Sequence, residues 1–165
     1  MNLPKTPRRP TLFAALALTI GAASAGSPHF VRGPDASINS SNANVTVSWK
    51  EAGLGDTTTV AYEASADGSA RYQCVNHGGK CPAASNKQDV LGPVSASGSF
   101  ASGKNGTITA SLTFEPPAGT LVCPGSQVLK LVSASFTDIA LADLTNNVVA
   151  AATPSSLSQS GPECP

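Results

Sequence analysis

Few residues of this chain have side chains suited to hydrolytic or metal chemistry. It contains two histidines, His29 and His77, and four cysteines. A nucleophile that needs a neighbouring base would have to use one of these histidines or a lysine. The many serines include no Gly-x-Ser-x-Gly elbow, and no His-Glu-x-x-His or paired Cys-x-x-Cys motif suggests zinc. We therefore predict no catalytic residue, no metal site and no cofactor.

The densest polar cluster is the loop Asn76-His77-Gly78-Gly79-Lys80-Cys81. Two glycines would let the backbone approach a partner, while Asn76, His77 and Lys80 would present hydrogen-bond donors. These three residues are the candidate ligand-binding residues. The simpler interpretation, which we prefer, is a glycine turn beside a disulfide.

Two further kinds of site are weighed against the remaining residues. Secreted copper oxidases of the β-sandwich type need a histidine at the first mature position, whereas the expected first residue is Gly26 and His29 lies three positions later. A sugar-binding module would expose flat aromatic rings. Trp49, Tyr62 and Tyr72 all fall in the inward phase of their strands, which favours packing in the core.

Three sequons would accept N-glycans if the protein is made by a eukaryote. They begin at Asn39, Asn44 and Asn105. Such triplets also arise by chance in chains rich in Ser and Thr, so glycosylation stays a hypothesis.

The first 25 residues have the order of regions found in a secretory signal. Lys5, Arg8 and Arg9 precede an apolar run over 11–20, and the small residues 23–25 follow it. The apolar run is too short to cross a bilayer. We predict cleavage after residue 25, a secreted, extracellular protein, and no membrane span.

Composition and charge limit the functions that the mature chain can have. Seven basic and ten acidic residues remain after residue 25, which gives a net charge of −3. Scattered lysines on a mildly acidic chain do not form the positive field that nucleic-acid binding requires, so we exclude nucleic acid as a partner. The length suits one domain, and we place it at 26–152, followed by a Ser/Pro-rich tail at 153–165 tied down by Cys164.

Four cysteines in an oxidising compartment predict two disulfides. The preferred pairs are Cys74 with Cys123, both within or at the ends of apolar β-like runs, and Cys81 with Cys164, which would tie the tail to a loop. In the chain-entropy model the long loops of these pairs would also constrain the unfolded chain more. The rival pairs are Cys74 with Cys81 and Cys123 with Cys164, and sequence alone does not choose between the two sets.

Alternation of apolar and polar residues predicts an all-β fold. It is regular over residues 45–50, 60–64, 94–100 and 107–114. The turn sequence Ser102-Gly103-Lys104-Asn105-Gly106 predicts a hairpin between the last two. Other turns are expected at 53–56, 67–68, 116–117 and 146–147, the last of them closing a hairpin between residues 139–144 and 148–152.

The apolar pattern changes phase within residues 128–136. Either both faces of that strand are covered, or a bulge switches the phase. Seven to nine short strands predict an antiparallel β-sandwich of immunoglobulin or fibronectin type, and a small barrel is the alternative. We expect little helix.

The sequences over 92–98, 102–106 and 123–125 resemble those of small secreted single-domain microbial proteins of unassigned function. The resemblance covers about residues 33–149 and implies a secreted, immunoglobulin-like β-fold. It implies no site residue.

These observations favour a secreted, non-enzymatic binding or display module, whose partner would be an extracellular protein or glycan. One alternative is an enzyme or inhibitor with a site assembled around His77 and Lys80. Another is an effector that acts on a host or a competitor.

Overall fold

All regular structure in the described part of the chain is β-strand. The computed structural model describes residues 26–83 and 85–165. The strands are β1 (His29–Ile38), β2 (Val45–Ala52), β3 (Thr59–Val75), β4 (Lys87–Ala101), β5 (Ile108–Phe114), β6 (Val128–Asp143), β7 (Val148–Ala151) and β8 (Leu157–Ser160). The all-β prediction is confirmed. The leader predicted at residues 1–25 lies outside the described residues, among which no helix is long and apolar enough to span a membrane.

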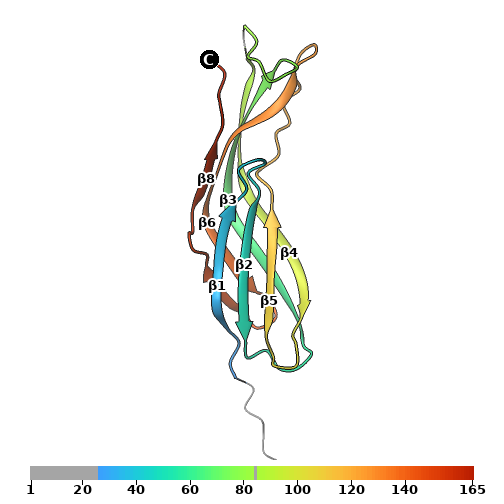
Figure 1. The fold of residues 1–165 in the computed structure, drawn as a ribbon, viewed down its shortest axis with the longest axis vertical. Coiled ribbons are helices and arrows are strands. Elements are labelled where there is room, and N and C mark those ends of the chain that lie inside the picture. The colour runs from blue at the N-terminus through green and yellow to red at the C-terminus, as the bar shows by residue number, and fades with distance from the viewer. Residues whose placement is uncertain (1–25, 84) are drawn as a thin grey trace, which may run out of the picture.

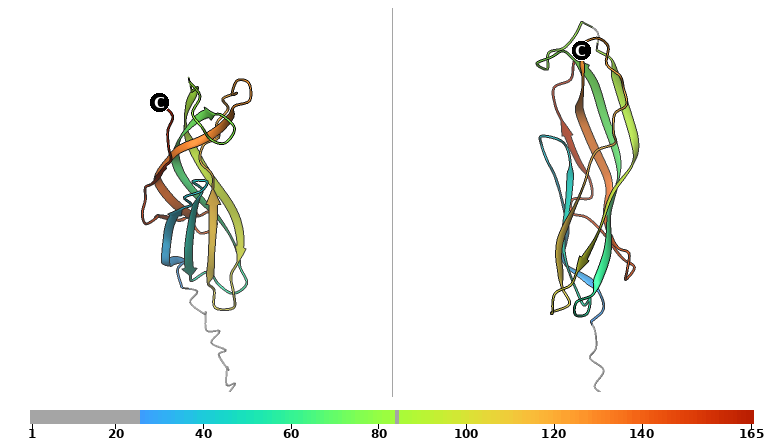
Figure 2. Two further views of the ribbon diagram at one scale, coloured as in Figure 1. Left: turned by 45° about the horizontal axis from the view of Figure 1, so that its top comes forward. Right: turned by 90° about the vertical axis from the view of Figure 1, so that its right-hand side faces the viewer.

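The strands form two antiparallel sheets. The small sheet has the order β1-β2-β5, and the large sheet has the order β4-β3-β6-β7, with β8 also paired to β6. The sheets face each other over the lower part of an elongated molecule, whereas the large sheet continues upward alone (Figures 1 and 2). The predicted two-layer arrangement is thus present in one half of the molecule.

The core fills the space between the two sheets. Residues of β2 and β3 that alternate along each strand are almost fully buried: Val45, Val47, Trp49, Val60, Tyr62 and Ala64. The rings of Trp49 and Tyr62 lie 4.8 Å apart, and Phe100 of β4 packs edge-on against Trp49 at 5.5 Å. The inward phase predicted for Trp49 and Tyr62 is therefore confirmed.

The predicted hairpin at residues 102–106 is wrong in its strand pairing. The turn is present, with a bond from Gly106 N to Gly103 O of 2.9 Å, but β4 pairs with β3 and β5 pairs with β2. The connection therefore crosses from the large sheet to the small one. Alternation predicts which face of a strand is buried, and it does not predict the neighbouring strand.

The predicted turn at residues 67–68 is also wrong, because both residues lie inside β3. Gly68 has a packing reason instead. A Cβ atom there would lie 2.8 Å from Cδ of Pro117, so glycine lets the segment that contains Pro117 cross the strand closely.

The phase change in β6 comes from a bulge, as one of the two alternatives predicted. Ser133 pairs with Arg71 and Leu131 pairs with Tyr72, so Val132 has no partner residue in β3. The last predicted hairpin is confirmed, since Asp143 of β6 pairs with Val148 of β7.

Candidate functional site

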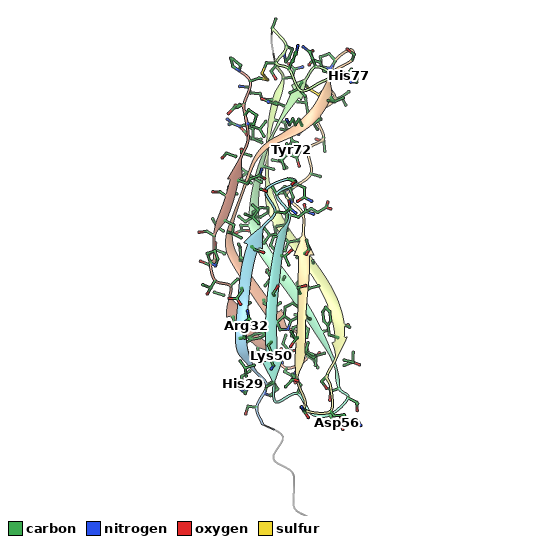
Figure 3. All side chains as sticks on the ribbon, in the orientation of Figure 1. His29, Arg32, Lys50, Asp56, Tyr72 and His77 are labelled. Carbon is green, nitrogen blue, oxygen red and sulfur yellow. A yellow bond between two sulfur atoms is a disulfide. The ribbon has the colours of Figure 1, made fainter. Side chains whose placement is uncertain are left out.

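The loop that carries the candidate ligand-binding residues lies at the upper end of the molecule, where Figure 3 labels His77. Asn76 N donates to the carbonyl of Lys80 at 2.9 Å, and Gly79 N donates to the carbonyl of Asn76 at 2.9 Å. Gly78 and Gly79 have φ angles of 86° and 76°. The glycines therefore supply the left-handed backbone of a closed turn, and the side chains of His77 and Lys80 are exposed.

Both disulfides lie in this upper half. Cys74, near the end of β3, bonds to Cys123, and Cys81 of the loop bonds to Cys164 of the tail. The preferred pairing is confirmed, and the rival pairing is excluded.

The first disulfide fastens residues 115–127, which we call the covering segment, to one face of the large sheet. The hydroxyl of Tyr72 donates to the carbonyl of Pro117 at 2.9 Å. The amide oxygen of Gln88 accepts bonds from the backbone N–H groups of Thr120 and Leu121 at 2.9 and 2.8 Å. The covering segment thus takes the place of a second sheet over this half. Tyr72 packs beneath it, half-buried, and is outside the hydrophobic core cluster.

The second disulfide fastens the tail to the opposite face. Gln73, which is 2 % exposed, accepts a bond from Cys164 N at 2.8 Å through its amide oxygen. Glu163 beside it lies 3.1 Å from Lys87 and 3.3 Å from Arg71. The hydrogen bond from Lys87, helped by the charges of Lys87 and Arg71, lowers the pKa of the Glu163 carboxyl.

The upper end also exposes apolar side chains. Val122 is 87 % exposed and Val128 is 45 % exposed, and they flank the upper turn of the covering segment. We call residues 76–82 and 122–128 together the tip. Among the described residues, His77 and Lys80 have no side-chain hydrogen-bond or ion-pair partner. The tip therefore combines free donors with exposed apolar surface.

A buried polar cluster lies far from the tip, inside the core. The hydroxyl of Tyr62 donates to Oε2 of Glu51 at 2.7 Å, and both side chains are fully buried. Glu51 Oε1 and Trp49 Nε1 have no partner among the described residues. Burial raises the pKa of the Glu51 carboxyl, the bond from Tyr62 opposes that shift, and the charge of Asp143 adds to it. Burial likewise raises the pKa of the Tyr62 hydroxyl.

This cluster was not predicted, although the sequence carries a signal for it. Glu51 continues the inward phase of Val47 and Trp49 along β2, so the same alternation that identified the core also places a carboxyl group in it. The cluster is closed to solvent and belongs to the core.

A shallow groove of about 420 Å³ lies on the outer face of the small sheet. Its charged lining residues are Arg32, Asp35 and Lys50, of which Figure 3 labels the two cations. A bulge in β1 leaves Gly33 and Pro34 without partners in β2, so Arg32 and Asp35 pair with Lys50 and Ser48 on the same face. Arg32 and Asp35 are 3.9 Å apart, so their charges offset each other, and Lys50 leaves the groove with one net positive charge.

The sequons differ in accessibility. Asn39 and Asn105 are exposed in turns, whereas Asn44 is half-buried. Within the described residues, no group of three His, Cys, Asp or Glu side chains is arranged to hold a metal ion. No family model, no curated protein and no solved structure matches the chain.

Proposed function

We propose that this protein is a secreted, non-enzymatic binding module that holds an extracellular protein partner at its tip. Its large sheet provides the support, its immunoglobulin-like lower half provides the stability, and His77, Lys80 and Val122 provide contacts. Asn76 shapes the loop through its backbone bonds.

One observation carries the proposal: two disulfides and the backbone bonds of its loop fasten the tip, while the side chains of His77 and Lys80 have no partner among the described residues. Cys74–Cys123 and Cys81–Cys164 bracket it from both faces of the sheet. A loop that is already ordered loses little conformational freedom when it binds, so more of its contact energy contributes to affinity. A surface that combines free donors with exposed apolar side chains is also typical of a protein interface.

Exposure of Val122 favours a protein over a glycan as the partner. An 87 % exposed valine contributes to binding only when a partner removes it from water. Sugars are usually bound against the rings of Trp, Tyr or Phe, and the tip contains none of these three residues.

The test uses site-specific photo-crosslinking of the mature protein in the extracellular fraction of the producing culture. A crosslinking amino acid is placed at Val122, at His77, or at Lys104, which lies with Asp56 at the opposite end. Figure 3 labels Asp56 at that end. We expect one protein adduct shared by the two tip positions and absent at Lys104. Excess wild-type protein should compete it away, and the His77→Ala/Lys80→Ala/Val122→Ser variant should not.

Two results would contradict the proposal. Equal labelling at both ends, or none at the tip, would show that the tip is not a contact surface. A tip adduct that is removed by glycosidases and carries no polypeptide would show that the partner is a glycan and not a protein.

A further inference from the structure

The free edge of the large sheet is a second surface, separate from the tip. β4 has 15 residues and pairs with β3 along its whole length without a register shift. No strand of the described chain pairs with its other side. A long edge of this kind presents a row of unpaired backbone donors and acceptors.

Two hydrogen bonds show which residues of β4 present them. One step beyond each end of the register, Cys74 N donates to Asn86 O at 2.9 Å, and Ser102 N donates to Thr58 O at 2.8 Å. Hydrogen-bonded pairs alternate along an antiparallel ladder, so the even-numbered residues of β4 bond to β3. The odd-numbered residues therefore direct their N–H and C=O groups toward the free edge.

Pro93 agrees with this assignment, since it occupies an odd position. A proline has no N–H to donate, and it costs a sheet nothing where that N–H would point to the free edge. The half of the edge that contains Pro93 is protected against pairing with another strand. Besides Pro93 itself, the charged residues Lys87 and Asp89 occupy two positions whose backbone groups point to the free edge.

The other half of the edge, residues 95–101, has no such protection. Its sequence, Ser-Ala-Ser-Gly-Ser-Phe-Ala, contains no charge, no proline and no bulge. Three of the other outer strands are protected, because β1 is bulged and bonded to Thr153, while β7 and β8 have four residues each. The fourth, β5 at the edge of the small sheet, also lacks charge, proline and bulge, but it has only seven residues and packs beside β4, where Leu112 lies close to Gly98. Natural edges are usually blunted by charges, proline, bulges or shortness, so an unblunted stretch indicates pairing with another strand.

We propose that the partner is a second copy of this chain, paired antiparallel through residues 94–100 around a two-fold axis at Ser97. The two large sheets would then form one continuous sheet. Symmetry places Ser95 opposite Ser99 and Ser97 opposite Ser97 of the second copy, all at positions whose backbone groups point outward. Identical strands can pair this way only where no like charges meet.

The inward-facing positions support the same register. It sets Val94 of one copy opposite Phe100 of the other, and both side chains are only partly buried at the rim of the core cluster. Pairing would bury more of both. Because the strands run antiparallel, the two tips would point in opposite directions, so one dimer could hold two partners at once.

Sedimentation equilibrium over a concentration series, combined with amide hydrogen exchange, tests the proposal. We expect a monomer–dimer equilibrium in which the amides of Ser95, Ser97 and Ser99 exchange slowly in the dimer and rapidly in the monomer. Ser97→Pro should leave the fold intact, because that N–H makes no bond to β3. It should raise the dimer dissociation constant at least about tenfold, since symmetry removes two donors together.

A charge at the same place gives a second, independent variant. Ser97→Lys sets two like charges opposite each other and should weaken the dimer, whereas Ser135→Lys, on the same face but within β6, should not. The proposal is overturned if the wild-type protein stays monomeric at millimolar concentration. It is also overturned by a dimer that tolerates both Ser97 variants, or one in which the three amides exchange rapidly.

Discussion

Replacing Tyr62 with Phe removes a single hydroxyl group from the centre of the core. That hydroxyl makes the 2.7 Å bond to Glu51, and the other carboxyl oxygen of Glu51 already lacks a partner among the described residues. The variant would leave a fully buried carboxyl group with no side-chain donor. Stranding a buried polar group costs roughly 1–3 kcal/mol of unfolding free energy, and we expect Tyr62→Phe to fall in this range.

The cost should depend on pH in a defined direction. Burial raises the pKa of Glu51 above its ordinary value of 4.5, so the unfolded protein ionises this group first. The contribution of Glu51 to stability is therefore most favourable below pH 4.5 and falls as the pH rises through its folded-state pKa. The bond from Tyr62 holds that pKa down. Without it the pKa rises further, and Tyr62→Phe should cost more at pH 7 than at pH 4.

Guanidinium unfolding with the disulfides intact, followed by the fluorescence of the single tryptophan, measures the effect. Wild type, Tyr62→Phe, Glu51→Gln and the double variant are compared at pH 4 and pH 7. Glu51→Gln keeps an acceptor for Tyr62 but has no proton to lose, so its stability should change less between these two pH values. In that background Tyr62→Phe should have a cost that does not depend on pH.

The reasoning would be refuted if Tyr62→Phe lowered the free energy of unfolding equally at pH 4 and pH 7, both in the wild type and in Glu51→Gln. Such a result would mean that the hydroxyl contributes through packing alone and that Glu51 is ionised, or hydrated, in the folded protein.

Three further predictions concern the upper half of the molecule. Gly119→Ala would place a Cβ atom 2.7 Å from the ring of Tyr72, whereas Gly92→Ala meets nothing within 4 Å; thermal unfolding should show a loss of about 1–3 kcal/mol for the first only. Replacing Cys81 and Cys164 by Ser opens a loop of 83 residues and should lower the unfolding free energy by about 4 kcal/mol in the chain-entropy model, with faster amide exchange in the tail. Hydrogen bonds from Arg71 and Lys87 lower the pKa values of Asp89 and Glu163, respectively. These two ion pairs should therefore stabilise the fold at neutral pH, and the stabilisation should disappear as the pH falls below about 4. In the variant Asp89→Asn/Glu163→Gln, the free energy of unfolding should fall less steeply between neutral and acid pH.

The alternation of side chains was enough to predict the inner faces of the sheets. Val45, Val47 and Trp49 are buried because each strand has one face against the core, and that property is local to the strand. The phase change near Val132 was visible for the same reason, but the pattern left open whether a bulge or cover on both faces caused it, and only the strand pairing shows the bulge. Strand pairing is different, because it depends on residues far away in the sequence, and for this reason the turn at residues 102–106 was assigned to the wrong pair of strands.

The candidate site was predictable only in part. The loop at residues 76–81 stood out by composition, but nothing in the sequence brings residues 122–128 beside it except the preferred pairing of Cys74 with Cys123. The side-chain oxygen of Gln88 accepts bonds from the backbone of Thr120 and Leu121. No pattern in the sequence around Gln88 indicates this role. Side chains that bond to the backbone of a distant segment become visible only in the folded chain.

The position of the disulfides explains why a protein with an ordinary core needs them. The hydrophobic core cluster contains no cysteine, so the lower half is stabilised by burial between two sheets. The upper half has one sheet, and its two faces are covered by the covering segment and the tail, which bury few large side chains. Ordering such segments costs conformational entropy that little burial offsets. A covalent link to each segment lowers that cost by restricting the unfolded chain. The lower half is thus the stable part, and the upper half is the part whose order depends on an oxidising environment, as expected if the tip is used outside the cell.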